Sequence, residues 1–251
     1  MTQTMALKTI LNYSPNFNPK KRILKEIKFI IFHYTGMRKE SEAINRLTNI
    51  QSEVSSHYLI KNNGEIVTIV PELYIAWHSG KSSWGSHKSL NKNSIGIEIT
   101  NPGHEFGYKK FSKKQIASIL KLSKFLIKKY KIKSKNILGH SDIAPDRKKD
   151  PGEKFPWKYL SQNKIGLWHS LKKQVLIESR ETQTTKTDKK TFFNNLFKIG
   201  YLKKFPKNTG KEGYLNCIIE AFQRRYRQDL IDSKIDQECL LISQNLMKKF
   251  H

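Results

Sequence analysis

The chain has 251 residues and a mass of 29.4 kDa, enough for one large domain or for a medium domain with a small one. With 47 Lys and Arg against 21 Asp and Glu, its formal net charge is +26. This charge predicts attraction to polyanions such as nucleic acid, an anionic membrane or an acidic wall polymer. A surface on which Lys serves only for solubility is the alternative. Two cysteines are too few for a disulfide framework or a thiolate zinc site, and no apolar run approaches the roughly 18 residues of a membrane span.

Five short segments are predicted to be β-strands. The continuous apolar run at residues 28–34 is typical of a central strand that is covered on both faces. Residues 57–60 and 65–70 flank a turn-forming Lys-Asn-Asn-Gly sequence and predict a hairpin. Two more strands are expected at residues 94–100 and 136–139.

One long helix is predicted between the last two strands. Ser112, with Gln115 three residues later, matches a capping box, and apolar side chains then follow at helical spacing as far as Tyr130. Strands combined with such a helix predict a mixed β-sheet flanked by helices, which is an α/β domain.

The strand at residues 94–100 carries a carboxylate. Its alternation places Ile95, Ile97 and Ile99 on one face and Glu98 on the other. A carboxylate on a buried strand is costly unless it is paired, hydrogen-bonded or bound to a cation, so Glu98 is a candidate functional group. An edge strand with Glu98 in water is the alternative.

Two histidines and an aspartate form a candidate ligand set. His33 lies near the end of the most hydrophobic strand, and the Gly- and Pro-containing loop at residues 139–152 carries His140 and Asp150. Two imidazoles and one carboxylate are a set that holds catalytic zinc with its fourth position open to water. Spacing alone does not bring these residues together, and a structural histidine is the alternative for His33.

The chain resembles the zinc-dependent N-acetylmuramoyl-L-alanine amidases of the type 2 family, which are related to peptidoglycan-recognition proteins. Four segments between residues 12 and 160 carry the resemblance, namely FIIFHYTG, VSSHYLIKNNGEIVTIVPELYIAWHSG, NSIGIEI and GHSDIAPDRKKDPG. The resemblance implies one Zn²⁺ per chain, with His33, His140 and Asp150 as ligands, Glu98 as the catalytic acid/base and Lys148 as the cation beside the reacting carbonyl. A carboxylate as third ligand, where the peptidoglycan-recognition branch usually has Cys, favours the bacterial wall-recycling branch.

The resemblance also implies an activity and a substrate. The expected reaction is hydrolysis of the amide between N-acetylmuramic acid, including its 1,6-anhydro form, and the L-alanine of the stem peptide, in cell-wall degradation or recycling. A peptidoglycan-recognition protein without catalysis and a nucleic-acid binder, which only the charge suggests, are the alternatives. Five residues with aromatic faces or polar tips are weaker candidates for substrate contacts, with ordinary packing as the alternative: Tyr34, His57, Trp77, His78 and Trp84.

A second domain is predicted at the C-terminus. Residues 178–190 contain no apolar side chain and are interpreted as a solvated linker between a catalytic domain, residues 1–177, and a small all-α domain, residues 191–251. The latter resembles a three-helix peptidoglycan-binding domain, with Ser233 where a Gly is often found, and a structural cap is the alternative. Wall binding would favour the cell envelope or periplasm, whereas the absence of an export signal in the first ten residues favours the cytoplasm.

Overall fold

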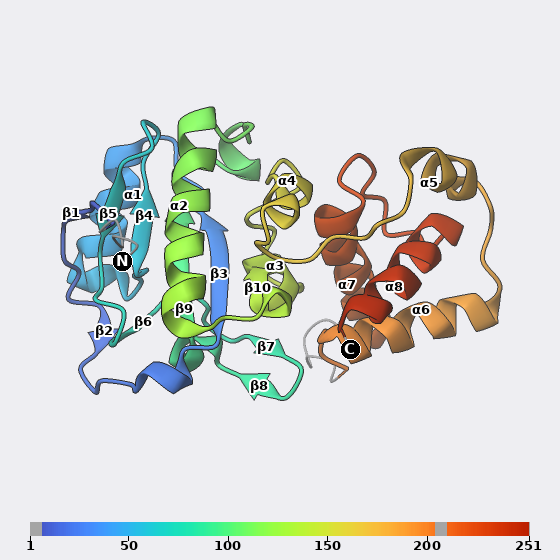
Figure 1. Cartoon of the computed structure of the whole chain (residues 1–251), viewed down its shortest axis with the longest axis horizontal. Helices are drawn as coiled ribbons and strands as arrows, with labels where there is room; N and C mark the ends of the chain where they lie inside the picture. Colours follow the sequence, from blue (N-terminus) through green and yellow to red (C-terminus); the bar gives the residue numbers. More distant parts are fainter. Residues whose placement is uncertain (1–6, 204–209, 251) are drawn as a thin grey trace, which may run out of the picture. The chain divides into compact units, whose positions relative to one another are not determined.

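The computed structural model describes residues 7–203 and 210–250 (Figure 1). The chain divides into two compact units, one of residues 1–80 and 90–138 and the other of residues 81–89 and 139–251. None of the helices in the described ranges combines the length and the hydropathy needed to cross a lipid bilayer.

A six-stranded mixed sheet with the order β1-β5-β4-β9-β3-β10 organises the first unit. β4 pairs with β5 antiparallel, as expected of the predicted hairpin, whereas β9 runs parallel to both β4 and β3. The predicted strands are therefore confirmed. Their bounds, together with those of the short first strand, are β1 (Ile10–Leu11), β3 (Phe29–Tyr34), β4 (Tyr58–Ile60), β5 (Ile66–Thr68), β9 (Ser94–Ile99) and β10 (Ile137–Gly139).

The two central strands, β3 and β9, are buried as their sequences predict. In β3 the apolar side chains from Phe29 to Phe32 are at most 2% exposed. In β9 the stripe of Ile95, Ile97 and Ile99 has no exposed surface. Because β9 lies between β4 and β3, the edge-strand alternative for Glu98 is wrong.

Helix α2 (Lys113–Tyr130) packs across this sheet (Figure 1). Ser112 caps it, accepting a hydrogen bond from Gln115 N at 3.1 Å, while the Gln115 side chain accepts one from Ser112 N at 3.0 Å, so the predicted capping box is confirmed. This unit also contains the helix α1 (Glu40–Thr48), the strand pair β2 (Phe17–Asn18) and β6 (Ile75–Ala76), and several short 3-10 helices.

Helices dominate the second unit, as the C-terminal patterns predict. α6, α7 and α8 enclose an apolar core that includes Phe192, Leu196, Ile218, Phe222 and Leu246, all without exposed surface. The elements of this unit are the strand pair β7 (Ser83–Trp84) and β8 (His87–Lys88), and the helices α3 (His140–Ile143), α4 (Trp157–Gln162), α5 (Lys173–Arg180), α6 (Lys186–Ile199), α7 (Gly210–Tyr226) and α8 (Gln237–Phe250).

The segment predicted as a linker is solvated but ordered. None of residues 178–190 is buried, yet they form the end of α5 and the beginning of α6. A segment without apolar side chains cannot join a hydrophobic core, but helix caps and ion pairs still hold its backbone in place. Thr185 accepts a hydrogen bond from Asp188 N at 3.1 Å, and Arg180 Nε donates one to Glu238 Oε2 at 2.6 Å. Residues on both sides belong to one compact unit, and the predicted domain boundary stays a prediction. The separate functions of residues 1–177 and 191–251 stay predictions.

Candidate metal centre

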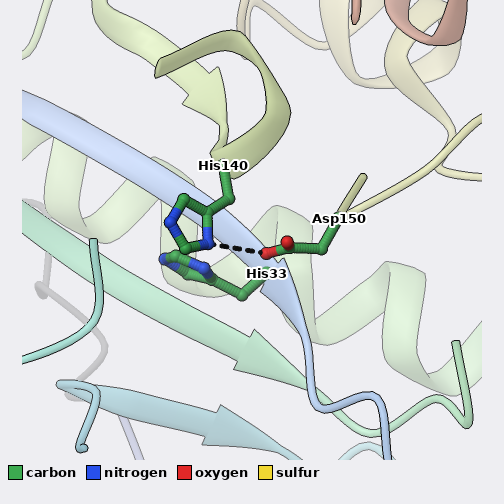
Figure 2. Close-up of side chains that lie close together, drawn as sticks. All are labelled: His33, His140 and Asp150. Carbon is green, nitrogen blue, oxygen red and sulfur yellow. Dashed lines mark hydrogen bonds and ion pairs between the residues drawn. The ribbon is translucent and has the colours of Figure 1, made fainter. Parts of the chain in front are cut away.

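The three predicted ligands lie together. Nitrogen atoms of His33 and His140 and a carboxylate oxygen of Asp150 all lie within 4.8 Å of one another, and all three residues are buried (Figure 2). His140 Nδ1 lies 3.1 Å from Asp150 Oδ2. A set of two imidazoles and one carboxylate at these distances could hold a metal ion, and its assignment to zinc stays a prediction.

The backbone of residues 139–152 brings His140 and Asp150 together. Ser141 N donates to the Asp150 carbonyl at 2.8 Å, which closes the loop. The side chain of Asp142 accepts from Gly139 N at 2.7 Å and fixes the first turn of α3, where His140 lies. Two ligands ten residues apart therefore converge through local hydrogen bonds.

A chain of hydrogen bonds favours one tautomer of His33. Ser94 Oγ donates to the Leu90 carbonyl at 2.6 Å, so its lone pair accepts from His78 Nε2 at 3.1 Å. In a neutral His78 that donates from Nε2, Nδ1 is the acceptor in its 3.0 Å contact with His33 Nε2, which then carries the proton. This tautomer leaves Nδ1 as the unprotonated nitrogen of His33. Metal-binding histidines characteristically donate their second ring N–H to a neighbouring acceptor in this way.

Gly96 makes room for this arrangement. A Cβ atom at this position would lie 2.4 Å from His78 Cγ and within 2.7 Å of two further ring atoms. The ring of His78 could then not keep its place over β9, next to His33. The absence of a side chain at position 96 is therefore a condition for the orientation of His33.

Gly96→Ala is expected to weaken metal binding. The added methyl group displaces His78 and removes the acceptor that fixes His33, and losses of such outer partners cost metal affinity about 10- to 100-fold. Zinc competition against a chelator measures the change. Gly85→Ala is the control for general destabilisation, because nothing lies within 4 Å of a Cβ there and only its left-handed backbone, with a φ of 56°, is strained by the methyl group. Equal zinc affinities of the two variants would contradict the role of His78.

The predicted acid/base lies beside the first ligand. Glu98 is the register partner of His33 in the parallel pair of β3 and β9, so both side chains project from the same face of the sheet. Glu98 is half-buried. Lys148 is also half-buried, and its backbone N–H donates to the Ala144 carbonyl at 3.0 Å, within the segment that carries His140 and Asp150. The catalytic roles of both residues stay predictions.

Two of the predicted substrate contacts are buried instead. His57 has no exposed surface: its Nδ1 accepts from Gly96 N at 2.9 Å, and its Nε2 lies 2.8 Å from Arg22 Nη2 and 3.1 Å from the Tyr74 carbonyl oxygen. Burial and the Arg22 charge both lower the pKa of His57, which keeps the ring neutral. Trp84 is 5% exposed and packs against Tyr201 with ring centroids 5.0 Å apart. Ordinary packing, the alternative to substrate contact, therefore explains the positions of His57 and Trp84 better.

The other predicted contacts differ in character. His78 is 7% exposed and bonded to His33, so it is better described as a positioning residue. Trp77 is 36% exposed and stays a candidate for substrate contact. Tyr34 is half-buried, and its hydroxyl lies 2.9 Å from His104 Nδ1, in an aromatic group that Tyr108 completes. Sequence patterns missed this group because only the fold brings residues 34 and 104 together.

Known proteins resemble this chain in sequence and in fold. The profile of the N-acetylmuramoyl-L-alanine amidase family (Amidase_2) matches residues 24–153. The chain is 36% identical over 236 residues to the N-acetylmuramoyl-L-alanine amidase AmiD of Escherichia coli (strain K12), covering 89% of this chain and 83% of that protein. It is 39% identical over 170 residues to the 1,6-anhydro-N-acetylmuramyl-L-alanine amidase AmpD of Haemophilus influenzae, covering 60% of this chain and 90% of that protein.

A solved structure agrees with the sequence relatives. The complex of AmiD from E. coli with the substrate anhydro-N-acetylmuramic acid-L-Ala-D-gamma-Glu-L-Lys matches with a TM-score of 0.77 at 33% identity, over 89% of this chain and 90% of that chain. The chain therefore belongs to the N-acetylmuramoyl-L-alanine amidase family. This membership confirms the resemblance, the fold class and the enzyme class that the sequence predicts.

Proposed function

We propose that the chain hydrolyses the amide bond between N-acetylmuramic acid, including its 1,6-anhydro form, and the L-alanine of the stem peptide, in the degradation or recycling of cell wall. The buried cluster of His33, His140 and Asp150 within the family-matched segment is the observation that carries the proposal. The anhydro-muropeptide in the AmiD complex supports this substrate class.

Zinc fits the cluster, at one ion per chain. His33 presents an unprotonated Nδ1 because its Nε2 donates to His78, and His140 and Asp150 complete a nitrogen- and oxygen-donor set that suits this ion. When bound, Zn²⁺ polarises the scissile carbonyl and lowers the pKa of a water molecule to about 7.

Two further side chains supply the proton transfer and the charge stabilisation. Glu98 takes a proton from the attacking water and returns it to the amine of L-alanine as the amide bond breaks. Lys148 stabilises the negative charge that develops on the carbonyl oxygen, for which a compact ammonium on a long stem is suited. The family membership and the position of Glu98 beside His33 support these roles.

The high positive charge suits an anionic substrate. Stem peptides carry carboxylates, which a chain with a formal charge of +26 attracts over long distances. The cell envelope or periplasm is the expected location if intact wall is the substrate, and the cytoplasm if soluble muropeptides are. These locations stay predictions.

Metal removal tests the proposal. The purified chain should contain about one zinc per molecule and should release the stem peptide from an anhydro-muropeptide, and exhaustive chelation should abolish both. Elemental analysis measures the metal, and mass spectrometry of the digest identifies the cleaved bond. Readdition of zinc controls for irreversible unfolding. Unchanged cleavage after complete metal removal would contradict the mechanism. A metal-loaded chain that cleaves no muropeptide would instead indicate a peptidoglycan-recognition protein without catalysis.

A further inference from the structure

Asp142 lies in the ligand loop but is not itself in the candidate ligand set. It follows His140 by two residues, is 1% exposed, and lies in the one-turn helix α3. Besides the bond from Gly139 N, its carboxylate accepts a hydrogen bond from the Tyr201 hydroxyl at 2.9 Å. It also forms an ion pair with Arg225 Nη1. Both side chains come from the C-terminal part of the chain, beyond residue 190.

Arg225 lies in a buried position beside Asp142. It lies near the end of α7 with its side chain 2% exposed, and its guanidinium stacks 4.3 Å from the ring centroid of Trp157. A guanidinium is held in a buried site when a carboxylate and aromatic faces surround it, as they do here. Burial and the Asp142 charge raise the pKa of Tyr201 well above its ordinary value, so its hydroxyl remains a donor.

A second contact joins α7 to the same part of the chain. The side chain of Gln228, just after α7, donates to the Phe155 carbonyl at 2.7 Å, five residues beyond Asp150. The C-terminal helices therefore contact the ligand segment through Asp142, near its beginning, and the chain just beyond its end through Phe155.

We propose that Asp142, Arg225 and Tyr201 form a positioning network through which the C-terminal helices hold residues 139–152 in the conformation that presents His140 and Asp150 to a metal ion. On this view residues 191–251 are a structural part of the metal centre, in addition to any affinity they have for wall polymer. The inference rests on the proposed metal site, and it assigns no chemical step to the three residues.

Zinc affinity of full-length variants provides the first test. Arg225→Met removes the charge and the donors, and it is expected to raise the zinc dissociation constant about tenfold or more, as losses of outer-shell partners do. Arg225→Lys, which retains a charge beside Asp142, should recover part of the affinity. Tyr201→Phe should act in the same direction with a smaller change. Chelator competition measures all three.

Arg227→Met is the matched control. Arg227 is also buried, at 2% exposed, and pairs with Asp232 at 2.5 Å and with Asp236, all within the C-terminal helical region. Its loss removes a comparable buried ion pair without touching the ligand segment. If Arg225→Met and Arg227→Met lower the melting temperature and the zinc affinity alike, the Arg225 pair only stabilises the fold and the proposal is overturned.

Amide hydrogen exchange of the metal-free protein separates this inference from the proposed reaction. Arg225→Met should accelerate exchange selectively at residues 139–152, whereas Arg227→Met should leave that segment at the wild-type rate. This measurement needs neither zinc nor a substrate, so it stands even if the chain cleaves no muropeptide. Unchanged protection of residues 139–152 in Arg225→Met would refute the network.

Discussion

Glu98→Gln is expected to lower kcat on a soluble anhydro-muropeptide by about 10²-fold or more, while the zinc content stays at the wild-type level. Glutamine has nearly the same shape as glutamate but cannot take a proton from water. The substitution lies on β9, between two hydrogen-bonded neighbours, so the backbone has no reason to move. The loss should therefore appear in the chemical step and spare the metal site.

Single-turnover kinetics and elemental analysis on the same preparation test this expectation. Glu65→Gln is the control, because Glu65 lies next to β5 and its partner is the surface residue Lys61, at 2.7 Å. That variant should keep the wild-type rate. If Glu98→Gln turned over at the wild-type rate, the proton acceptor would be another group, and His57 would be a poor replacement because it is fully buried with both ring nitrogens engaged.

His140→Ala is expected to lose zinc and turnover together. Removing one of three protein ligands takes away the geometry that selects zinc, and the water whose pKa the ion lowers is lost with it. Because His140 is 4% exposed, alanine also leaves a cavity that lowers stability. Asp150→Asn provides a variant of nearly equal volume, and it should show the same combined loss without the cavity.

Elemental analysis, activity and thermal unfolding should be measured together for these two variants. His87→Ala, a histidine in β8 that belongs to no part of the ligand cluster, should retain one zinc and full activity. A folded His140→Ala or Asp150→Asn protein that kept stoichiometric zinc would show that the ion is held elsewhere. Retained zinc in Glu98→Gln beside lost zinc in His140→Ala would separate binding from chemistry.

The features of this protein that depend on neighbours along the chain are predictable from its sequence. Apolar runs and turn residues predicted β3, the hairpin of β4 and β5, and β9, because burial and backbone hydrogen bonding impose their periods locally. The capping box at Ser112 predicted where α2 begins. The ligand set could be predicted for a different reason, because the motif around His140 and Asp150 is distinctive enough to identify the family.

The residues that support that site can be identified only in the folded chain. His78 contacts His33 across 45 positions of sequence, and Arg225 contacts Asp142 across 83. In the sequence His78 has the same character as a substrate-binding aromatic residue, and Arg225 is one of 47 cationic residues. Likewise, the polar composition of residues 178–190 correctly excluded them from the core but could not reveal the ion pair of Arg180 with Glu238 that orders them. Such roles depend on burial and on contacts between residues that are distant in sequence. Neither residue spacing nor composition specifies which residues will be in contact in the folded chain.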